Sequence, residues 1–397
     1  MEPGRGRENS GMKFFFSKEK EVREPSAGYA FDSRCRYELV KLLGRGGMGE
    51  VWTARKISAA GHVQNVAVKF MSDPGMDVTT LDTEALRMSF LVHDNIVPFI
   101  DSGTDEQGRY FVVMAFIEGM DLNGLRELAT GSAAGCGQGA ASRIPDKIVG
   151  FILFMTLRAL VYAHSRDFGG GAVGLIHRDI SPGNILLDER EGFVKLADFG
   201  VAAVQSKDQS HCQIAGKLPY MAPEVLVEDP INCQVDIYSL GLVAYELVTG
   251  FNPNLRPEAM KSVLGAISEV MLSIDRPLRL PHEVVDGVDP ALSRIIGKML
   301  EKDRAARYAT AADVMADMGV FLFEKGYGPT TRSLGDYLWL MRDPSRRADD
   351  SMKQELRFLD FDNCPDAARP ARCLSAAARD DLAAGRNPGR VHSPDED

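Results

Sequence analysis

The chain has 397 residues, of which 45% are hydrophobic and 26% are charged, so it is long enough for two or three domain-sized units with a sizeable core. Its formal net charge of -10 argues against nonspecific nucleic-acid binding, which requires a basic surface, and we expect no nucleic-acid partner. The six cysteines are scattered without CxxC spacing, which favours reduced thiols over a disulfide framework or a zinc site.

A small β-rich lobe is predicted at 37–118, after a segment, 1–36, whose mixed Gly, Glu, Lys, Arg and Pro content predicts a mobile tail. The segments YELVKLLG, EVWTARK and QNVAVKFM are predicted strands, joined by a glycine-rich turn and a polar loop. Residues 77–91 have helical spacing, and IVPFIDSG and RYFVVMAF are two further predicted strands. This lobe therefore has five predicted strands and one helix.

A larger helical lobe is predicted at 119–325. Its longest apolar runs, 148–157 and 237–245, lie inside predicted buried helices and are too short to span a bilayer. Because the N-terminus also lacks an apolar segment long enough for a signal peptide, we expect a cytoplasmic protein with no integral membrane segment. The predicted helices of this lobe are 121–129, capped by Asp121, and 145–164, 234–248, 290–300 and 309–323.

The last segment, 326–397, is rich in Arg, Asp, Ala and Pro, which predicts a largely disordered C-terminal extension. It contains two apolar clusters, at 337–341 and 356–361. These clusters either dock on the body of the protein or are surface residues of a frayed helix, and we favour the second interpretation.

The stretch LIHRDISPGNILLDEREGFVKLADFG, at 175–200, reads as a loop, a strand, a charged turn, a second strand and another loop. Asp179 and Asn184 lie on the first loop, and Asp198 lies on the second. A strand pair that brings these side chains into one cleft suits a divalent metal and phosphate, because Mg²⁺ prefers a few hard oxygen ligands and completes its shell with phosphate and water.

The HRD at 177–179, the following Asn184 and the DFG at 198–200 resemble the catalytic and metal-binding loops of eukaryotic-type protein kinases, most of all bacterial serine/threonine-protein kinases. The resemblance implies an α+β, bilobal protein-kinase-like fold and ATP-dependent transfer of the γ-phosphate to serine or threonine hydroxyls of protein substrates. Asp179 would be the catalytic base, and Asn184 and Asp198 would hold Mg²⁺.

A GxGxxG pattern lies between two predicted strands at 43–51, and glycine there allows backbone N–H groups to approach phosphates. A predicted strand follows this pattern, whereas a helix follows a Rossmann loop. The difference favours a glycine-rich loop that covers a bound nucleotide.

Lys69 ends the strand motif VAVK; its ammonium either meets an anion or reaches to the surface. By resemblance it contacts the α- and β-phosphates and is braced by Glu84, with Asp82 the less favoured partner. The resemblance implies a nucleotide site formed by Leu43, Gly44, Gly46, Gly47, Gly49, Val51, Ala67, Lys69, Met114, Ile117, Asp121 and Leu186.

The sequence APE at 222–224 resembles the motif that closes the kinase activation segment, with Arg307 as its ion-pair partner. Asp236 matches the acid that anchors the catalytic loop. These features favour a protein substrate over a small-molecule phosphotransferase. A pseudokinase that binds nucleotide or partners is the other alternative, although Lys69, Asp179 and Asp198 are all present.

Two positions depart from the family pattern: Ser181 replaces the usual lysine, and Lys217 replaces the usual threonine. We hypothesise that Lys217 supplies the ammonium that Ser181 cannot; the equal alternative is that Lys217 faces solvent. Gly183 stands where tyrosine kinases carry arginine, which favours Ser/Thr specificity over tyrosine or dual specificity. Arg178 beside Asp179 marks kinases whose activation loop is often ordered by phosphorylation, and Ser210 is our predicted phosphosite, although an unphosphorylated loop is equally compatible.

Overall fold

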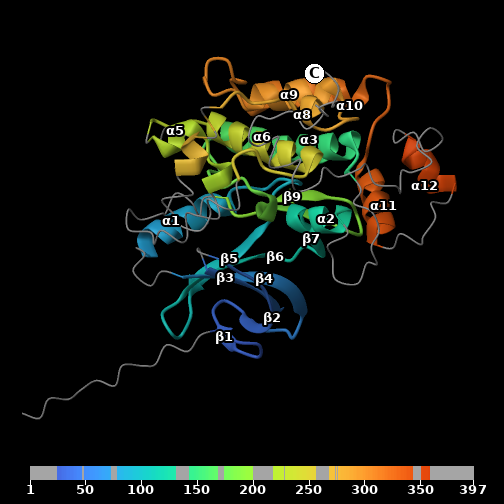
Figure 1. Ribbon diagram of the computed structural model, residues 1–397. Coiled ribbons are helices and arrows are strands. Elements are labelled where there is room, and N and C mark those ends of the chain that lie inside the picture. Colours follow the sequence, from blue (N-terminus) through green and yellow to red (C-terminus); the bar gives the residue numbers. More distant parts are fainter. Residues whose placement is uncertain are drawn as a thin grey trace, which may run out of the picture.

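The computed structural model describes residues 25–46, 49–72, 78–130, 143–168, 174–199, 218–227, 229–255, 268–272, 274, 276–342 and 350–357. These residues form a β-sheet lobe and a helical lobe, as Figure 1 shows, so the predicted α+β bilobal fold is confirmed. The sheet lobe consists of β1 (Ala30–Asp32), β2 (Arg36–Gly46), β3 (Gly49–Ile57), β4 (Val63–Met71), α1 (Val78–Ser89), β5 (Phe99–Thr104) and β6 (Tyr110–Ala115). The helical part contains β7 (Gly119–Asp121), α2 (Leu122–Ala129), α3 (Asp146–Ser165), β8 (Ile185–Asp188), β9 (Val194–Leu196), α5 (Pro223–Leu226), α6 (Gln234–Thr249), α8 (Pro281–Val284), α9 (Pro290–Met299), α10 (Ala311–Phe323), α11 (Thr331–Arg342) and α12 (Asp350–Glu355).

The N-terminal sheet has six strands in the order β1-β2-β3-β4-β6-β5, and all neighbouring pairs are antiparallel. The five predicted strands are confirmed, but β1 lies inside the segment predicted as a mobile tail. Phe31 of β1 is 1% exposed and stacks on Tyr37, with 5.3 Å between ring centroids. Burial of this aromatic ring ties β1, which precedes the predicted boundary at residue 37, to the sheet.

The C-terminal lobe is built around α3 and α6, which lie in its middle in Figure 1. Every residue of α6 from Gln234 to Val248 is buried, which explains why its sequence is apolar on nearly all sides. By length and composition α3 could cross a membrane, with a mean hydropathy of 1.6, but 61% of that window is buried inside the fold. A core helix passes the same test, so α3 is weak evidence for a membrane span.

The segment after residue 326 is helical and docked, contrary to the interpretation favoured from its sequence. In α11, Leu334 and Leu338 are fully buried and join the core of the C-terminal lobe, as does Leu356 just beyond α12. The prediction of a largely disordered extension is therefore wrong for α11 and α12, since apolar residues of α11 and Leu356 after α12 are buried against the lobe. Residues 358–397 lie outside the described part of the chain.

A buried ion pair joins the end of the activation segment to the rest of the helical lobe. The guanidinium of Arg307 donates to both carboxylate oxygens of Glu224, at 2.7 and 3.2 Å. Their side chains are 0% and 4% exposed, and Arg307 also donates to the carbonyl of Gln234 at 3.0 Å. The pair implied by the resemblance is present, and its geometry is bidentate.

We expect Arg307→Ala to lower the free energy of unfolding by about 3–5 kcal/mol, because it leaves the Glu224 carboxylate buried without its partner. Urea unfolding measures this loss. Arg36→Ala is the control, since Arg36 is half exposed and lies 3.4 Å from Glu38; it should cost less than about 1 kcal/mol. Equal losses for the two variants would contradict the prediction.

Candidate active site

A buried carboxylate of α6 holds the loop that carries Asp179. Asp236 is 1% exposed, and its two oxygens accept hydrogen bonds from the backbone N–H groups of His177 and Arg178, each at 2.8 Å. The ring of His164 lies 2.8 Å from the same carboxylate. Burial alone would raise the pKa of Asp236, but the contacts with His164 and with the loop amide hold it below its usual value. The anchoring acid implied by the resemblance therefore makes the expected contacts.

Two residues of the site have left-handed backbone conformations. Arg178 has φ = 64° and Asp198 has φ = 62°, and they are the only such non-glycine residues among those described. Each conformation costs of order 1–3 kcal/mol and persists only where surrounding contacts impose it. Asp236 imposes it on the first loop, and His177 links the first loop to the second by a 2.8 Å contact with the carbonyl of Ala197. The backbone strain therefore lies on the two loops that carry the predicted chemistry.

Asn184 connects the predicted base to the predicted metal site. Its Nδ2 donates to the backbone carbonyl of Asp179 at 2.7 Å and to Oδ2 of the same residue at 3.0 Å. The carbonyl of Asn184 accepts from the N–H of Ala197 at 2.9 Å, next to Asp198. The antiparallel hairpin of β8 and β9 thus brings Asp179, Asn184 and Asp198 together, as the sequence predicts.

Lys69 forms an ion pair across the two lobes. Its Nζ lies 2.7 Å from Oδ2 of Asp198, 129 residues away in the chain. The Lys69 side chain is 5% exposed, so the alternative in which it reaches to the surface is wrong. A cation buried this far needs an anion, and here the anion is the predicted metal ligand.

The expected ion pair between Lys69 and Glu84 is not formed in this structure. Oε1 of Glu84 instead accepts from Arg87 at 2.6 Å, and Oε2 is buried without a partner among the described residues. Burial raises the pKa of Glu84, although the nearby charges of Arg87 and Arg178 oppose the shift. Asp82, the less favoured partner, accepts from the hydroxyl of Tyr110 at 2.9 Å. Asp198 therefore takes the place of the helix carboxylate.

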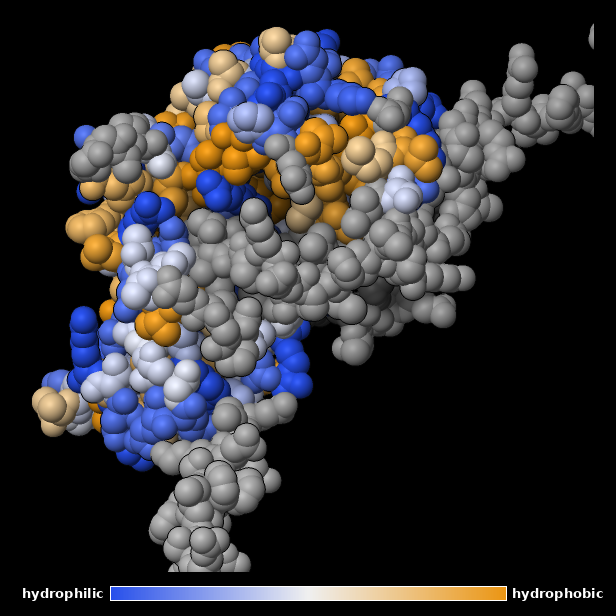
Figure 2. Space-filling view, turned by 90° about the vertical axis from the view of Figure 1, so that its left-hand side faces the viewer, coloured by the Kyte–Doolittle hydropathy of each residue, from blue (hydrophilic) through white to orange (hydrophobic). Residues whose placement is uncertain are grey.

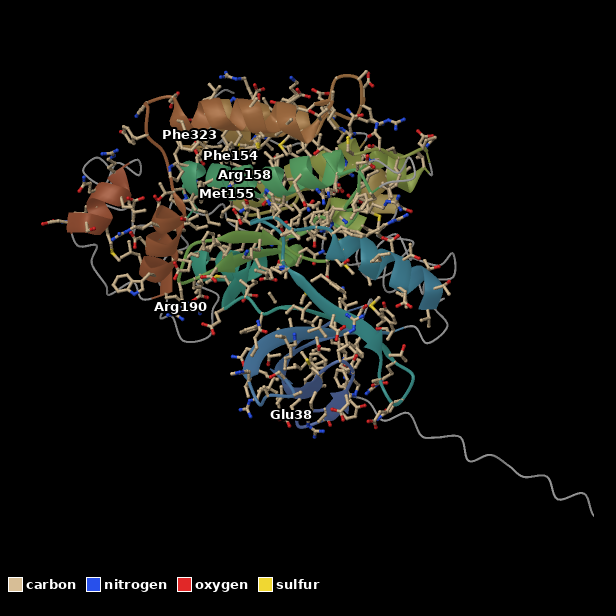
Figure 3. All side chains as sticks on the ribbon, turned by 180° about the vertical axis from the view of Figure 1, so that it is seen from behind. Glu38, Phe154, Met155, Arg158, Arg190 and Phe323 are labelled. Atoms are coloured by element: carbon tan, nitrogen blue, oxygen red, sulfur yellow. The ribbon has the colours of Figure 1, made fainter. Side chains whose placement is uncertain are left out.

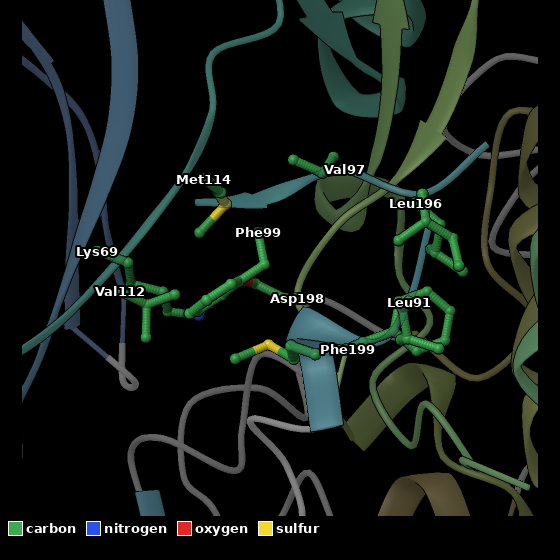
Figure 4. Close-up of a pocket in the computed structure, with 11 residues that line it drawn as sticks. Lys69, Leu91, Val97, Phe99, Val112, Met114, Leu196, Asp198 and Phe199 are labelled. Carbon is green, nitrogen blue, oxygen red and sulfur yellow. Dashed lines mark hydrogen bonds and ion pairs between the residues drawn. The ribbon is translucent and has the colours of Figure 1, made fainter. Parts of the chain in front are cut away.

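A cavity of about 30 Å³ lies between α1, the sheet and the second loop. Figure 4 shows Lys69 and Asp198 on its wall, with the apolar side chains of Phe99, Met114 and Phe199 around them. It has room for about one water molecule. The helix that carries Glu84 is thus incompletely packed where it approaches Lys69.

Strand pairing brings together several of the residues expected at the nucleotide. Ala67 pairs with Met114 between β4 and β6, and Asp121 pairs with Leu186 between β7 and β8. Ile117 lies in the connection from β6 to β7 that joins the lobes. Asp121 also caps α2, since its carboxylate accepts from the N–H of Gly124 at 2.9 Å, as predicted. The Asp121 carboxylate therefore stabilises the start of α2, in addition to the contact with ribose that the sequence predicts.

The glycine-rich pattern forms the β2–β3 hairpin. Gly44 is opposite Val51, and Gly46 is opposite Gly49. A Cβ at Gly49, which has φ = 135°, would overlap the carbonyl oxygen of Phe70, so glycine is required at this position. Leu43 on β2 is 49% exposed. Gly47, Lys217 and Ser210 lie outside the described residues.

Sequence reasoning missed a polar cluster beside the catalytic loop. Glu246 is buried in α6, 2.7 Å from Arg126 of α2 and 2.5 Å from the hydroxyl of Tyr220. Burial, together with the Glu246 carboxylate, raises the pKa of Tyr220, so its hydroxyl stays protonated and donates. The available signal was a single carboxylate inside an otherwise apolar helix, because such a group requires partners.

Comparison with known proteins agrees with the fold. Residues 37–318 match the protein kinase domain, and the chain therefore belongs to the protein kinase family. The kinase domain of Mycobacterium tuberculosis PknI has a similar fold, with a TM-score of 0.53 and 23% identity, over 75% of this chain and 98% of that one.

The curated relatives are longer proteins. Serine/threonine-protein kinase Pkn1 of Myxococcus xanthus is 32% identical over 77% of this chain and 40% of its own length. Probable serine/threonine-protein kinase CPE1738 of Clostridium perfringens is 31% identical over 71% of this chain and 38% of its own. Tyrosine-protein kinase MasK of Myxococcus xanthus is 31% identical over 76% of this chain and 45% of its own length. The chain thus spans less than half the length of these relatives.

We expect Glu84→Gln to become more stable relative to the unsubstituted protein as the pH rises. A raised pKa means that the folded state disfavours the ionised carboxylate, so this stability cost is absent below about pH 4.5 and develops as the pH rises through the raised pKa. By pH 8 the variant should therefore melt at a higher temperature than the unsubstituted protein. Thermal unfolding from pH 5 to pH 8 measures the difference, with Glu38→Gln on exposed β2 as the control. A difference that does not change with pH would contradict the assignment.

Proposed function

We propose that this protein transfers the γ-phosphate of ATP, with Mg²⁺, to serine or threonine hydroxyls of protein substrates, and that it does so in the cytoplasm. The observation that carries the proposal is a pair of contacts joined by the β8–β9 hairpin: Lys69 contacts Asp198, and Asn184 contacts Asp179. Two strained backbone positions hold this arrangement. A lysine, a base and two oxygen ligands held in fixed positions are what phosphoryl transfer requires, because its loose transition state gains mainly from positioning and charge neutralisation.

The donor set fits Mg²⁺. Nδ2 of Asn184 is directed at Asp179, which makes its Oδ1 the atom available as a ligand, and Asp198 supplies carboxylate oxygens. Among the described residues there is no group of three or more His, Cys, Asp or Glu side chains that would form an all-protein metal cage. Mg²⁺ is commonly held in this way, by one or two side chains together with substrate phosphates. When bound, it would neutralise charge on the phosphate oxygens.

The remaining steps belong to side chains of the chain itself. Lys69 would leave Asp198 for the phosphates, so nucleotide binding exchanges one anionic partner of the ammonium for another. Glu84 would then be the carboxylate that orients Lys69. Asp179, which is 8% exposed, would accept or orient the proton of the substrate hydroxyl, and Asn184 keeps its carboxylate in place.

A pocket beside Asp179 supports a protein substrate. It has a volume of about 110 Å³ and is lined by the catalytic loop and by Tyr220, Met221, Val225 and Ile231. Its apolar wall suits a side chain next to the acceptor hydroxyl. In Figure 2 the N-terminal lobe is mainly hydrophilic on the face shown, whereas hydrophobic residues gather on the C-terminal lobe above it.

Tyrosine specificity is the second candidate. The relative MasK, which is 31% identical, is named a tyrosine-protein kinase. Serine/threonine specificity is preferred because the chain has Gly183 where tyrosine kinases carry arginine. A pseudokinase is disfavoured, since Lys69, Asp179 and Asp198 are all present, with Lys69 in contact with Asp198 and Asn184 in contact with Asp179.

We expect Asp179→Asn to reduce phosphate transfer by about 10²–10⁴-fold while Mg·ATP still binds, because the amide keeps the shape but cannot take the proton. Peptide mass spectrometry after incubation with Mg·ATP measures transfer, and ATP-dependent thermal shift measures binding. Phosphoserine or phosphothreonine on the unsubstituted protein alone supports the proposal, whereas phosphotyrosine overturns the specificity. Asp198→Asn is the matched variant, and it should lose the Mg²⁺ dependence of binding.

We also expect Lys217→Ala to collapse turnover with ATP affinity little changed, if Lys217 supplies the ammonium that Ser181 lacks. Steady-state kinetics with varied ATP separate the two effects. Lys325→Ala is a suitable control, because Lys325 is exposed and lies outside the two loops and the β8–β9 hairpin. Near-normal turnover of Lys217→Ala would end this hypothesis.

A further inference from the structure

The segment that follows the family match is packed against the hairpin that carries the metal ligands. The match ends at residue 318, whereas α11 begins at Thr331. Leu334 and Leu338 of α11 are fully buried, and Tyr337 is 5% exposed. The helix therefore covers a surface of the lobe instead of projecting from it.

The surface beneath α11 is the turn between β8 and β9. A Cβ at Gly192 in this turn would overlap the carbonyl oxygen of Thr331 and lie 2.7 Å from the N–H nitrogen of Gly335. A Cβ at Gly335 would in turn lie 3.6 Å from the carbonyl oxygen of Arg190. Figure 3 shows Arg190 below the end of α11. Two backbones thus meet where glycine on each side permits close approach.

A charged contact fastens the other end of α11 to the same turn. Nε of Arg342 donates to Oε2 of Glu189 at 3.0 Å, and its Nη2 contacts Oε1 of that carboxylate. The backbone N–H of Glu189 donates to the carbonyl of Glu118 at 3.1 Å, in the connection between the lobes. The turn is therefore held from two sides.

This turn lies at one end of the β8–β9 hairpin, and Asn184 and Asp198 lie at the other end. Asn184 immediately precedes β8, and Asp198 follows β9 by two residues. The four residues of β8 span about 13 Å, and β8 and β9 pair over only three positions. Short hairpins depend on packing for a fixed geometry, so support of the turn also limits movement of the two ligands.

We propose that α11 is a positioning element for the metal-binding hairpin, acting through Gly192, Glu189 and Arg342. The segment holds the turn and thereby sets the placement of Asn184 and Asp198. The proposal rests on the phosphate transfer proposed above for its kinetic readout. None of the three positioning residues touches a reacting group; they act through the hairpin.

The first test is Gly192→Ala, because its methyl group cannot fit beneath α11. The matched control is Gly108→Ala in the β5–β6 turn: Gly108 has φ = 82°, similar to the 67° of Gly192, but nothing lies within 4 Å of its Cβ position. The control therefore carries the backbone strain without the clash. We expect Gly192→Ala to lower kcat about tenfold with KM for ATP and peptide unchanged, and Gly108→Ala to leave kcat unchanged.

The second test is charge reversal. Arg342→Glu and Glu189→Arg should each lower kcat about threefold, a modest effect because the side chains are 50% and 25% exposed. The double variant, which restores opposite charges, should recover most of the loss. This test can be made even if Gly192→Ala does not fold. A double variant whose kcat is no higher than that of its less active parent overturns the role of the ion pair.

Two readouts do not depend on turnover. Hydrogen exchange of the β8 and β9 amides should quicken in Gly192→Ala, and the Mg²⁺ concentration needed for half-maximal nucleotide binding should rise. If the unsubstituted protein transfers no phosphate, the proposed function fails while these readouts still decide the positioning role. Exchange and Mg²⁺ dependence identical to those of Gly108→Ala overturn the positioning proposal, whatever the activity.

Discussion

The need to satisfy one buried carboxylate shapes the whole site. Asp236 sits inside a helix that is buried on every side, where an unpaired charge would be prohibitively costly. Two consecutive loop amides and His164 meet this need, and in doing so they impose the left-handed backbone of Arg178. The core of the C-terminal lobe thus holds the loop in place. The anchored loop in turn fixes the positions of Asp179 and Asn184.

The N-terminal lobe contributes a buried cation that requires an anionic partner. Lys69 is fixed by its strand, and its partner in this structure is Asp198. Glu84 is then left with one unpaired oxygen and a raised pKa, next to a small cavity. A phosphate group near Lys69 would compete with Asp198 for the ammonium.

The two ends of the β8–β9 hairpin have different supports. The end with Asn184 and Asp198 rests on the core of the C-terminal lobe, where Ile185 of β8 and Leu196 of β9 are buried. The turn rests on α11, a helix beyond the region shared with the family, and on Glu118. The functional unit therefore extends past residue 318, because the site geometry depends on both ends of a short strand pair.

The sequence by itself determined the order and type of most elements and the identity of the chemical groups. Alternating or helical apolar patterns located the strands β2–β6 and the helices α1, α3, α6, α9 and α10, since burial of one face is a local property. The spacing of Asp179, Asn184 and Asp198 was also enough to predict that their loops lie side by side, because a hairpin joins the loops. Only the tertiary structure decided that Lys69 pairs with Asp198 and not with Glu84, and that α11 is docked. Both outcomes depend on which surfaces meet across more than a hundred residues, and alternative partners of similar chemistry differ only in their position in space.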